Sequence, residues 1–144
     1  MQMKASAFTI GVFLIVAGAA TVYAESRVDL EIESVQIHPA RPSSETPILL
    51  AASIRNNGSE SVGSFTISVS IRQNGKKVRT IRDVPVLSTL PRLGSGLSVP
   101  VQIGKLPGGD YEAVAIVDPA DRIEETNENN NSQVKTFHVS ESIF

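Results

Sequence analysis

The chain has 144 residues, no cysteine and a formal net charge of −2. This length suits one domain. The absence of cysteine excludes disulfide bonds and a lipid anchor attached through cysteine, and the slight acidity offers no basic stripe for nucleic acid.

The first 24 residues predict a secretory signal peptide. Lys4 gives the amino terminus a positive charge, Phe8–Val16 is strongly apolar, and no further charged residue occurs before Glu25. Val22 and Ala24 are small residues at the −3 and −1 positions of a cleavage site, so we expect cleavage after Ala24. An uncleaved membrane anchor is the alternative. It is disfavoured because Ser, Thr, Gly and Ala interrupt the segment, and its strongly apolar centre is shorter than a bilayer span.

Cleavage would leave residues 25–144 as one domain, with 12 Lys and Arg against 15 Asp and Glu and therefore a net charge of −3. A core can form at this length without disulfides. Small exported animal domains often carry disulfides, so the sequence favours a prokaryotic source. We expect a secreted, periplasmic or cell-surface protein that keeps no membrane span after cleavage.

The first half of this domain predicts four strands, because apolar and polar residues alternate with a period of two between turn signals. The apolar residues of the first strand change parity at about Ser34, which indicates a bulge and a strand that passes from one sheet to the other. The Asn74-Gly75 pair predicts a type I′ hairpin between the third and fourth strands. The fourth strand is polar enough to lie at an edge. The expected ranges are 28–37, 47–55, 65–72 and 76–82.

The second half predicts a loop over 83–96 and three further strands, at 97–103, 111–117 and 133–139. Pro100 lies on the outward parity of its strand, which suits an edge. The 111–117 segment is apolar on both faces and therefore predicts a central strand. Tyr111 fits a tyrosine corner whose hydroxyl reaches the backbone near Leu106. The whole pattern predicts an all-β fold, a seven-stranded antiparallel immunoglobulin-like β-sandwich preceded by the signal peptide.

Three stretches of the chain resemble the CARDB family, named for cell adhesion-related domains in bacteria. They are residues 54–65, 74–78 and 117–131, and the resemblance extends over residues 28–139. The resemblance implies a sandwich similar to fibronectin type III domains. It also implies an extracellular module, often repeated or joined to other domains. It does not imply a catalytic activity.

The segment from 118 to 131 is the candidate metal site, because it concentrates carboxylates and asparagines. Calcium binds six to eight such oxygen ligands, and a cation would relieve the repulsion between the carboxylates. The EF-hand pattern is absent, since no glycine follows Gly109. The candidate calcium ligands are Asp118, Asp121, Glu124, Glu125 and Glu128.

A structural loop is the alternative that the sequence favours for the same segment. We expect the segment to connect two central strands, so it must satisfy its backbone polar groups, and Asn and Asp side chains do this locally. Ile123 would pack on the core, while Glu125, Asn127 and Asn130 would accept hydrogen bonds from backbone amides.

Catalysis is not predicted. There is no G-x-S-x-G motif, and His38 and His138 are interpreted as ordinary strand residues because a triad needs further partners. The mature segment has no Cys or Met for copper(I), and too few aromatic residues for a sugar-stacking surface. We therefore expect no enzyme activity and no cofactor, with calcium as the one open case.

The predicted function is that of a non-catalytic exported protein-interaction or adhesion-related module. Its partner would be a protein or a cell-surface component, and no nucleic acid. The alternatives are a calcium-dependent adhesion or surface-assembly module that uses the 118–131 loop, and an accessory subunit of an exported enzyme. Pro100 and the charged 76–82 strand indicate protected edges, so the loops at the ends of the sandwich are the expected contact surfaces.

Overall fold

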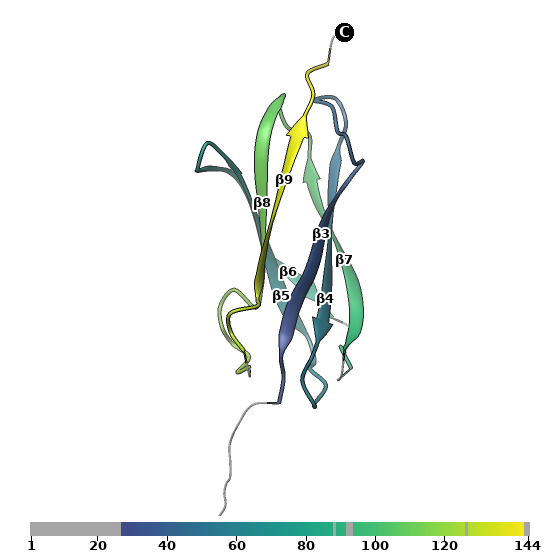
Figure 1. Cartoon of the computed structure of the whole chain (residues 1–144), viewed down its shortest axis with the longest axis vertical. Helices are drawn as coiled ribbons and strands as arrows, with labels where there is room; N and C mark the ends of the chain where they lie inside the picture. The colour runs from purple at the N-terminus through teal and green to yellow at the C-terminus, as the bar shows by residue number, and fades with distance from the viewer. Residues whose placement is uncertain (1–26, 88, 92–93, 126, 143–144) are drawn as a thin grey trace, which may run out of the picture.

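The computed structural model describes residues 27–142 except 88, 92, 93 and 126 (Figure 1). The predicted signal peptide and its cleavage site lie outside the described residues. The described part of the chain is built from strands and their connections, and no helix in it is long and apolar enough to cross a membrane.

Seven strands form two antiparallel sheets, as the sequence predicts. The order is β3-β4-β7 in one sheet and β6-β5-β8-β9 in the other. The strands of the first sheet are β3 (Leu30–His38), β4 (Ile48–Asn56) and β7 (Ser95–Gly104). Those of the second are β6 (Lys76–Val86), β5 (Phe65–Gln73), β8 (Gly109–Val117) and β9 (Ser132–Val139).

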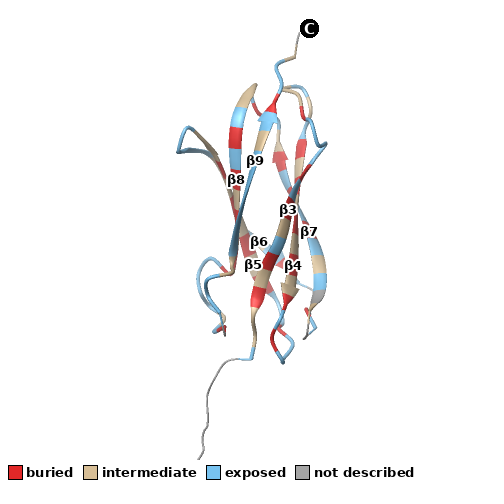
Figure 2. Ribbon diagram, viewed as in Figure 1, coloured by how far each residue is buried: buried red, intermediate tan, exposed pale blue. Residues whose placement is uncertain are grey.

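The core lies between the two sheets and is made mainly by alternate residues of β3, β4, β5, β7 and β8, while β6 and β9 each bury only their last residue, Val86 and Val139 (Figure 2). In β4, Ile48, Leu50, Ala52 and Ile54 are buried, while the residues that alternate with them are half-buried. The same alternation buries Ile67 and Ile71 in β5. Each such Ile or Leu side chain contributes about 1.5–3 kcal/mol on burial, so the period-two pattern of the sequence is what fixes the inward face of each strand.

The bulge in the first strand is confirmed, but the predicted change of sheet within that strand is wrong. The register between β3 and β4 shifts between Ile32 and Ser34, and β3 still pairs with β4 along its whole length. The extra residue restores the inward parity, so buried positions before and after the bulge enter the same core. The chain reaches the second sheet only later, where Ser43 forms a parallel bridge with Ser140 just beyond β9.

The Asn74-Gly75 hairpin is confirmed, since both residues have positive φ angles of 53° and 78°. The predicted loop over 83–96 is shorter than expected, because β6 continues to Val86 and pairs with the start of β5. The ladder shifts near Asp83, which has a φ of 54°. Pro85 fits into this extension because β6 is an edge strand, where a missing backbone donor costs nothing to the ladder.

The tyrosine corner is confirmed at the start of β8. The hydroxyl of Tyr111 donates a hydrogen bond of 2.7 Å to the carbonyl oxygen of Pro107, and the ring stacks on Phe137 at a centroid distance of 5.7 Å. β8 is central, as predicted. β9 is an edge strand, so the long 118–131 connection does not join two central strands as the sequence suggested.

Candidate functional site

The 118–131 segment joins β8 to β9 at the same end of the sandwich as the start of β3 (Figure 1). Two backbone bonds secure its end. Val117 donates to the carbonyl of Asn131 at 2.8 Å, and Ile32 donates to the carbonyl of Asn130 at 3.3 Å. The segment therefore bridges the second sheet and the first strand of the other sheet.

Asp118 organises the first turn of the segment. Its two carboxylate oxygens accept hydrogen bonds from the backbone amides of Arg122, at 3.0 Å, and Ile123, at 2.9 Å. Its own amide donates to the carbonyl of Thr66 at 2.8 Å. Ile123 packs against the core, as predicted. Because Asp118 is buried and both oxygens are engaged by amides, its charge is used to hold the turn.

Glu125 fastens the second half of the segment to β3. The side chain is 7% exposed, and one oxygen accepts the Leu30 amide at 2.6 Å. The other oxygen accepts from the side-chain amide of Asn131 at 2.5 Å. Glu128 in turn accepts the amide of Glu125 at 3.1 Å and contacts the same Asn131 amide group at 3.3 Å.

The pKa of Glu125 is raised from its ordinary value to about 7, chiefly because burial disfavours the charged carboxylate. The hydrogen bonds from Asn131 and Leu30 lower the pKa, and the nearby Glu128 carboxylate raises it. This buried carboxyl therefore changes its protonation near neutral pH, whereas an exposed glutamate would stay charged.

The structure divides the five candidate calcium ligands instead of gathering them. Asp118 belongs to the first turn, Glu125 and Glu128 form a second cluster, and Asp121 and Glu124 are exposed. Within the described ranges, no three His, Asp or Glu side chains come together as a group that could hold a metal ion.

The asparagines of the segment follow the structural prediction in part. Asn127 accepts the amide of Asn129 at 2.9 Å, as expected. The prediction for the Asn130 side chain is wrong, because its amide group donates to Asp29 at 3.0 Å and its side-chain oxygen is buried without a partner. Leu30 and Ile32 contact this loop although they are about 95 residues away in the sequence, and the sequence pattern does not predict such a contact.

Asn56, the last residue of β4, has a structural role that the sequence analysis did not identify. It is fully buried, and its side-chain oxygen accepts the amides of Asp29, at 3.1 Å, and Gly58, at 2.9 Å. Its amide group donates to the carbonyl of Glu60 at 2.7 Å. The Asn-Asn-Gly turn was the available signal, since Asn side chains commonly bond the backbone two residues on.

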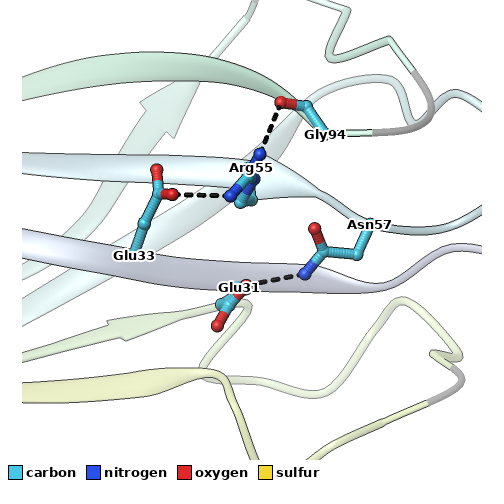
Figure 3. A network of polar contacts seen from close by, with 5 residues as sticks. All are labelled: Glu31, Glu33, Arg55, Asn57 and Gly94. Atoms are coloured by element: carbon cyan, nitrogen blue, oxygen red, sulfur yellow. Dashed lines mark hydrogen bonds and ion pairs between the residues drawn. The ribbon is translucent and has the colours of Figure 1, made fainter.

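An exposed polar network crosses the outer face of β3 and β4 near this end (Figure 3). Arg55 pairs with Glu33 at 2.6 Å and donates to the carbonyl of Gly94 at 3.2 Å, while Asn57 donates to Glu31 at 2.6 Å. The side chains of the ion pair are 35% and 46% exposed. Solvent screening leaves such a pair worth about 0–1 kcal/mol, so the network supports the sheet and defines no reactive site.

A groove of about 720 Å³ lies between β9 and the second half of β3. We call it the β3–β9 groove. Ile37, Pro42 and Phe137 give it apolar walls, and Arg41 and Lys135 lie along it. His38 and His138, the two histidines of the sequence, also line it. His138 contacts Asp110 at 2.7 Å, and both side chains are largely exposed.

These features define a class of protein before any comparison. The two-sheet topology, the tyrosine corner and the hydrogen-bonded connection are those of an immunoglobulin-like β-sandwich module. The sequence profile of the CARDB family matches residues 27–135, and the chain belongs to that family. Among curated proteins, no sequence matches the chain.

Solved structures agree with this fold. The chain is 25% identical to the CARDB domain of a Pyrococcus furiosus protein in complex with di-metal ions, with a TM-score of 0.56 over 83% of this chain and 93% of that one. It is 24% identical to a domain of a Methanosarcina acetivorans protein assigned to the cell surface, with a TM-score of 0.59 over 79% and 93%. A Paenibacillus cycloisomaltooligosaccharide glucanotransferase is 18% identical, with a TM-score of 0.61 over 78% of this chain and 14% of that one. The last two likenesses show the fold alone.

Proposed function

We propose that this chain is a non-catalytic module of the exported or cell-surface compartment, which binds another protein or a surface component. The observation that carries the proposal is that carboxylates of the 118–131 segment bind backbone amides of the chain itself. Asp118, Glu125 and Glu128 direct their oxygens to amides that shape the loop and fix β3, so the segment acts as a support. Because these polar side chains bind the backbone of the sandwich itself, binding to a partner would use its surfaces and its strand edges.

Membership of the CARDB family supports the same proposal. The charge pattern of residues 1–24 supports export with cleavage after Ala24. An exported enzyme as partner, with this chain as its accessory subunit, is one form of the proposal.

Cross-linking in the native host tests this function. Export predicts an intact mass that begins at Glu25, found outside the cytoplasm, and a lysine-reactive cross-linker should join the chain reproducibly to one partner. Recovery of the chain with Met1 intact in the cytoplasm would contradict export. A hydrolytic or transfer activity of the purified chain would contradict a non-catalytic role.

A metal-dependent module is the second candidate, and two observations favour it. The similar Pyrococcus furiosus domain was solved in complex with di-metal ions. In the present chain, buried side-chain oxygens of Asn130 and Asn131 have no hydrogen-bond partner, and Asn131 contacts both Glu125 and Glu128. Hard oxygens of this kind are calcium ligands.

Thermal unfolding in chelator and in calcium separates the two candidates. At a calcium concentration about 100-fold above its dissociation constant, binding would add about 2.7 kcal/mol of stability. Glu128→Gln would remove that gain, whereas the matched variant Glu112→Gln on the outer face of β8 would keep it. An unchanged melting temperature in calcium would reject the second candidate.

A further inference from the structure

The four sheet edges of this sandwich are not equally protected. β6 carries Lys76, Lys77 and Arg79 with a bulge near Asp83, and β7 contains Pro100. Charges, bulges and prolines of this kind prevent an edge from pairing with another strand. The first half of β3 is covered by the 118–131 segment, through the bonds of Leu30 and Ile32 described above.

The free edge of β9 has no comparable cover. β9 is the last strand in its sheet and pairs only with β8. The chain contacts this edge just before the strand, at the Asn130 carbonyl, and just after it, where Ser140 donates to Pro42 at 3.0 Å and accepts from Ser44 at 2.8 Å. Between these two points β3 lies near β9, but no strand of the described residues pairs with this edge of β9.

The direction of the backbone groups follows from the bonds at Ser140. Both its N–H and its C=O point away from β8, toward Pro42 and Ser44. In a strand this direction repeats at every second residue. The N–H and C=O groups of Val134, Thr136 and His138 therefore point to the free edge. Those of Lys135 and Phe137 point to β8, so the free edge presents an unpaired ladder.

The β3–β9 groove lies along this ladder, and Arg41 and Lys135 give it positive charge. The residues that line it include no Asp or Glu, although His138 contacts the exposed Asp110 beside it. None of the ion pairs among the described residues involves Arg41 or Lys135. The chain as a whole is slightly acidic, so this local positive charge is not a reflection of its composition. A groove of this charge attracts carboxylates.

A second copy of the chain is a poor occupant. Lys135 has the same parity as Phe137 and lies opposite Ala113, whose side chain is in the core. A lysine directed inward on an edge strand opposes pairing with another edge of the same kind. Two β9 edges paired with each other would also bring two Lys135 side chains together, and like charges at this distance are destabilising.

We propose that the free edge of β9, with the β3–β9 groove, binds an extended acidic segment of a partner protein. The segment adds a strand beside Val134, Thr136 and His138, and its main chain pairs with their N–H and C=O groups. Its apolar side chains contact Ile37 and Phe137, and its carboxylates approach Lys135 and Arg41. This inference deepens the proposed function, on which it rests, because it names the surface and the chemistry of the partner.

Amide hydrogen exchange of the mature chain tests the inference. The probe is the acetylated and amidated peptide Val-Thr-Glu-Thr-Val-Thr-Glu-Thr, which carries Val and Glu on the same face of a strand, as Phe137 and Lys135 are on β9. The control peptide has Lys in place of each Glu. Near saturation with the acidic peptide, exchange at Val134, Thr136 and His138 should slow about tenfold or more, and exchange at Lys135 and Phe137 should change less. The basic peptide should produce no such alternation.

Two charge reversals provide the matched variants. Lys135→Glu should weaken binding of the acidic peptide about threefold or more, the effect of reversing one exposed charge pair. Lys76→Glu makes the same change of charge on β6, at the other edge of the same sheet, and should leave the affinity within about twofold of the original. Arg41→Glu replaces Lys135→Glu if that variant does not fold.

Three results would overturn the inference. The acidic peptide leaves the β9 amides unchanged, or the basic peptide protects them equally, or the chain alone forms dimers that protect them. If the peptide fails while cross-linking still captures a partner, the inference is wrong and the proposed function stands, with another surface as the contact.

Discussion

β3 and β9 face each other along one side of the sandwich. We call the part at the start of β3 the closed half, because loop residues bind its backbone, and the part at the β3–β9 groove the open half. In the closed half, Glu125 and Asn130 occupy the backbone donors at the start of β3. In the open half, the same strands diverge around a groove, and the edge of β9 is left without a strand. The difference teaches that a dense group of charged residues can be the structural part of a small domain. The more ordinary strand next to it then carries the open binding surface.

Asn56 gives the largest expected effect in the closed half. Asn56→Ala would remove the buried side chain that binds the amides of Asp29 and Gly58 and the carbonyl of Glu60, and it would leave the Gly58 amide buried without a partner. We expect a loss of about 2–4 kcal/mol in the free energy of unfolding, measured in urea. Asn57→Ala is the control, because Asn57 is exposed, and should cost less than about 1 kcal/mol. Equal losses in the two variants would mean that burial does not distinguish the two residues.

The raised pKa of Glu125 predicts that the free energy of unfolding depends on pH. Its pKa is raised from 4.5 to about 7 in the folded state, mainly by burial. Between these values the folded chain holds a proton that the unfolded chain releases, so stability decreases as the pH rises. We expect a loss of about 1–3 kcal/mol between pH 5 and pH 8, measured by urea unfolding.

Two variants sharpen this pH prediction. Glu125→Gln removes the titrating group and should flatten that part of the profile. Glu112→Gln removes an exposed carboxylate of β8 and should keep it. A profile of the original chain that rises from pH 5 to pH 8 would contradict the raised pKa.

Asp118 tests the turn that begins the connection. Asp118 has a positive φ of 50°, which Asn tolerates. Asp118→Asn replaces one of the two oxygens that accept the Arg122 and Ile123 amides with an NH2 group, and should lower the free energy of unfolding by about 1–2 kcal/mol. Asp121→Asn is the matched change at an exposed residue of the same turn, which also has a positive φ, of 53°. It should change stability by less than about 0.5 kcal/mol, because Asn tolerates this conformation.

The open half should be nearly indifferent to a change on its surface. Val134 is 55% exposed on the outer face of β9. Val134→Thr keeps the branched shape and strand preference, so the free energy of unfolding, followed by the melting temperature, should change by less than about 0.5 kcal/mol. A loss above about 1 kcal/mol would indicate that this face is covered within the molecule.

The sequence predicted most of the fold because the determinants were local. Alternation located the strands, Asn74-Gly75 set the hairpin, and Tyr111 marked the tyrosine corner. It did not predict that β9 is an edge, since strand order depends on contacts between distant segments. The burial of Glu125 was hidden for the same reason, because its partner Leu30 lies 95 residues away. The change of sheet expected in β3 was wrong because a bulge can restore parity without moving a strand.

The central claim is that the free edge of β9 is open while the start of β3 is closed, and amide exchange of the unliganded mature chain tests it most directly. The account predicts fast exchange at Val134, Thr136 and His138, slow exchange at Lys135 and Phe137, and slow exchange at Leu30 and Ile32. Uniformly slow exchange along β9 in the monomer, or fast exchange at Leu30 and Ile32, would contradict it.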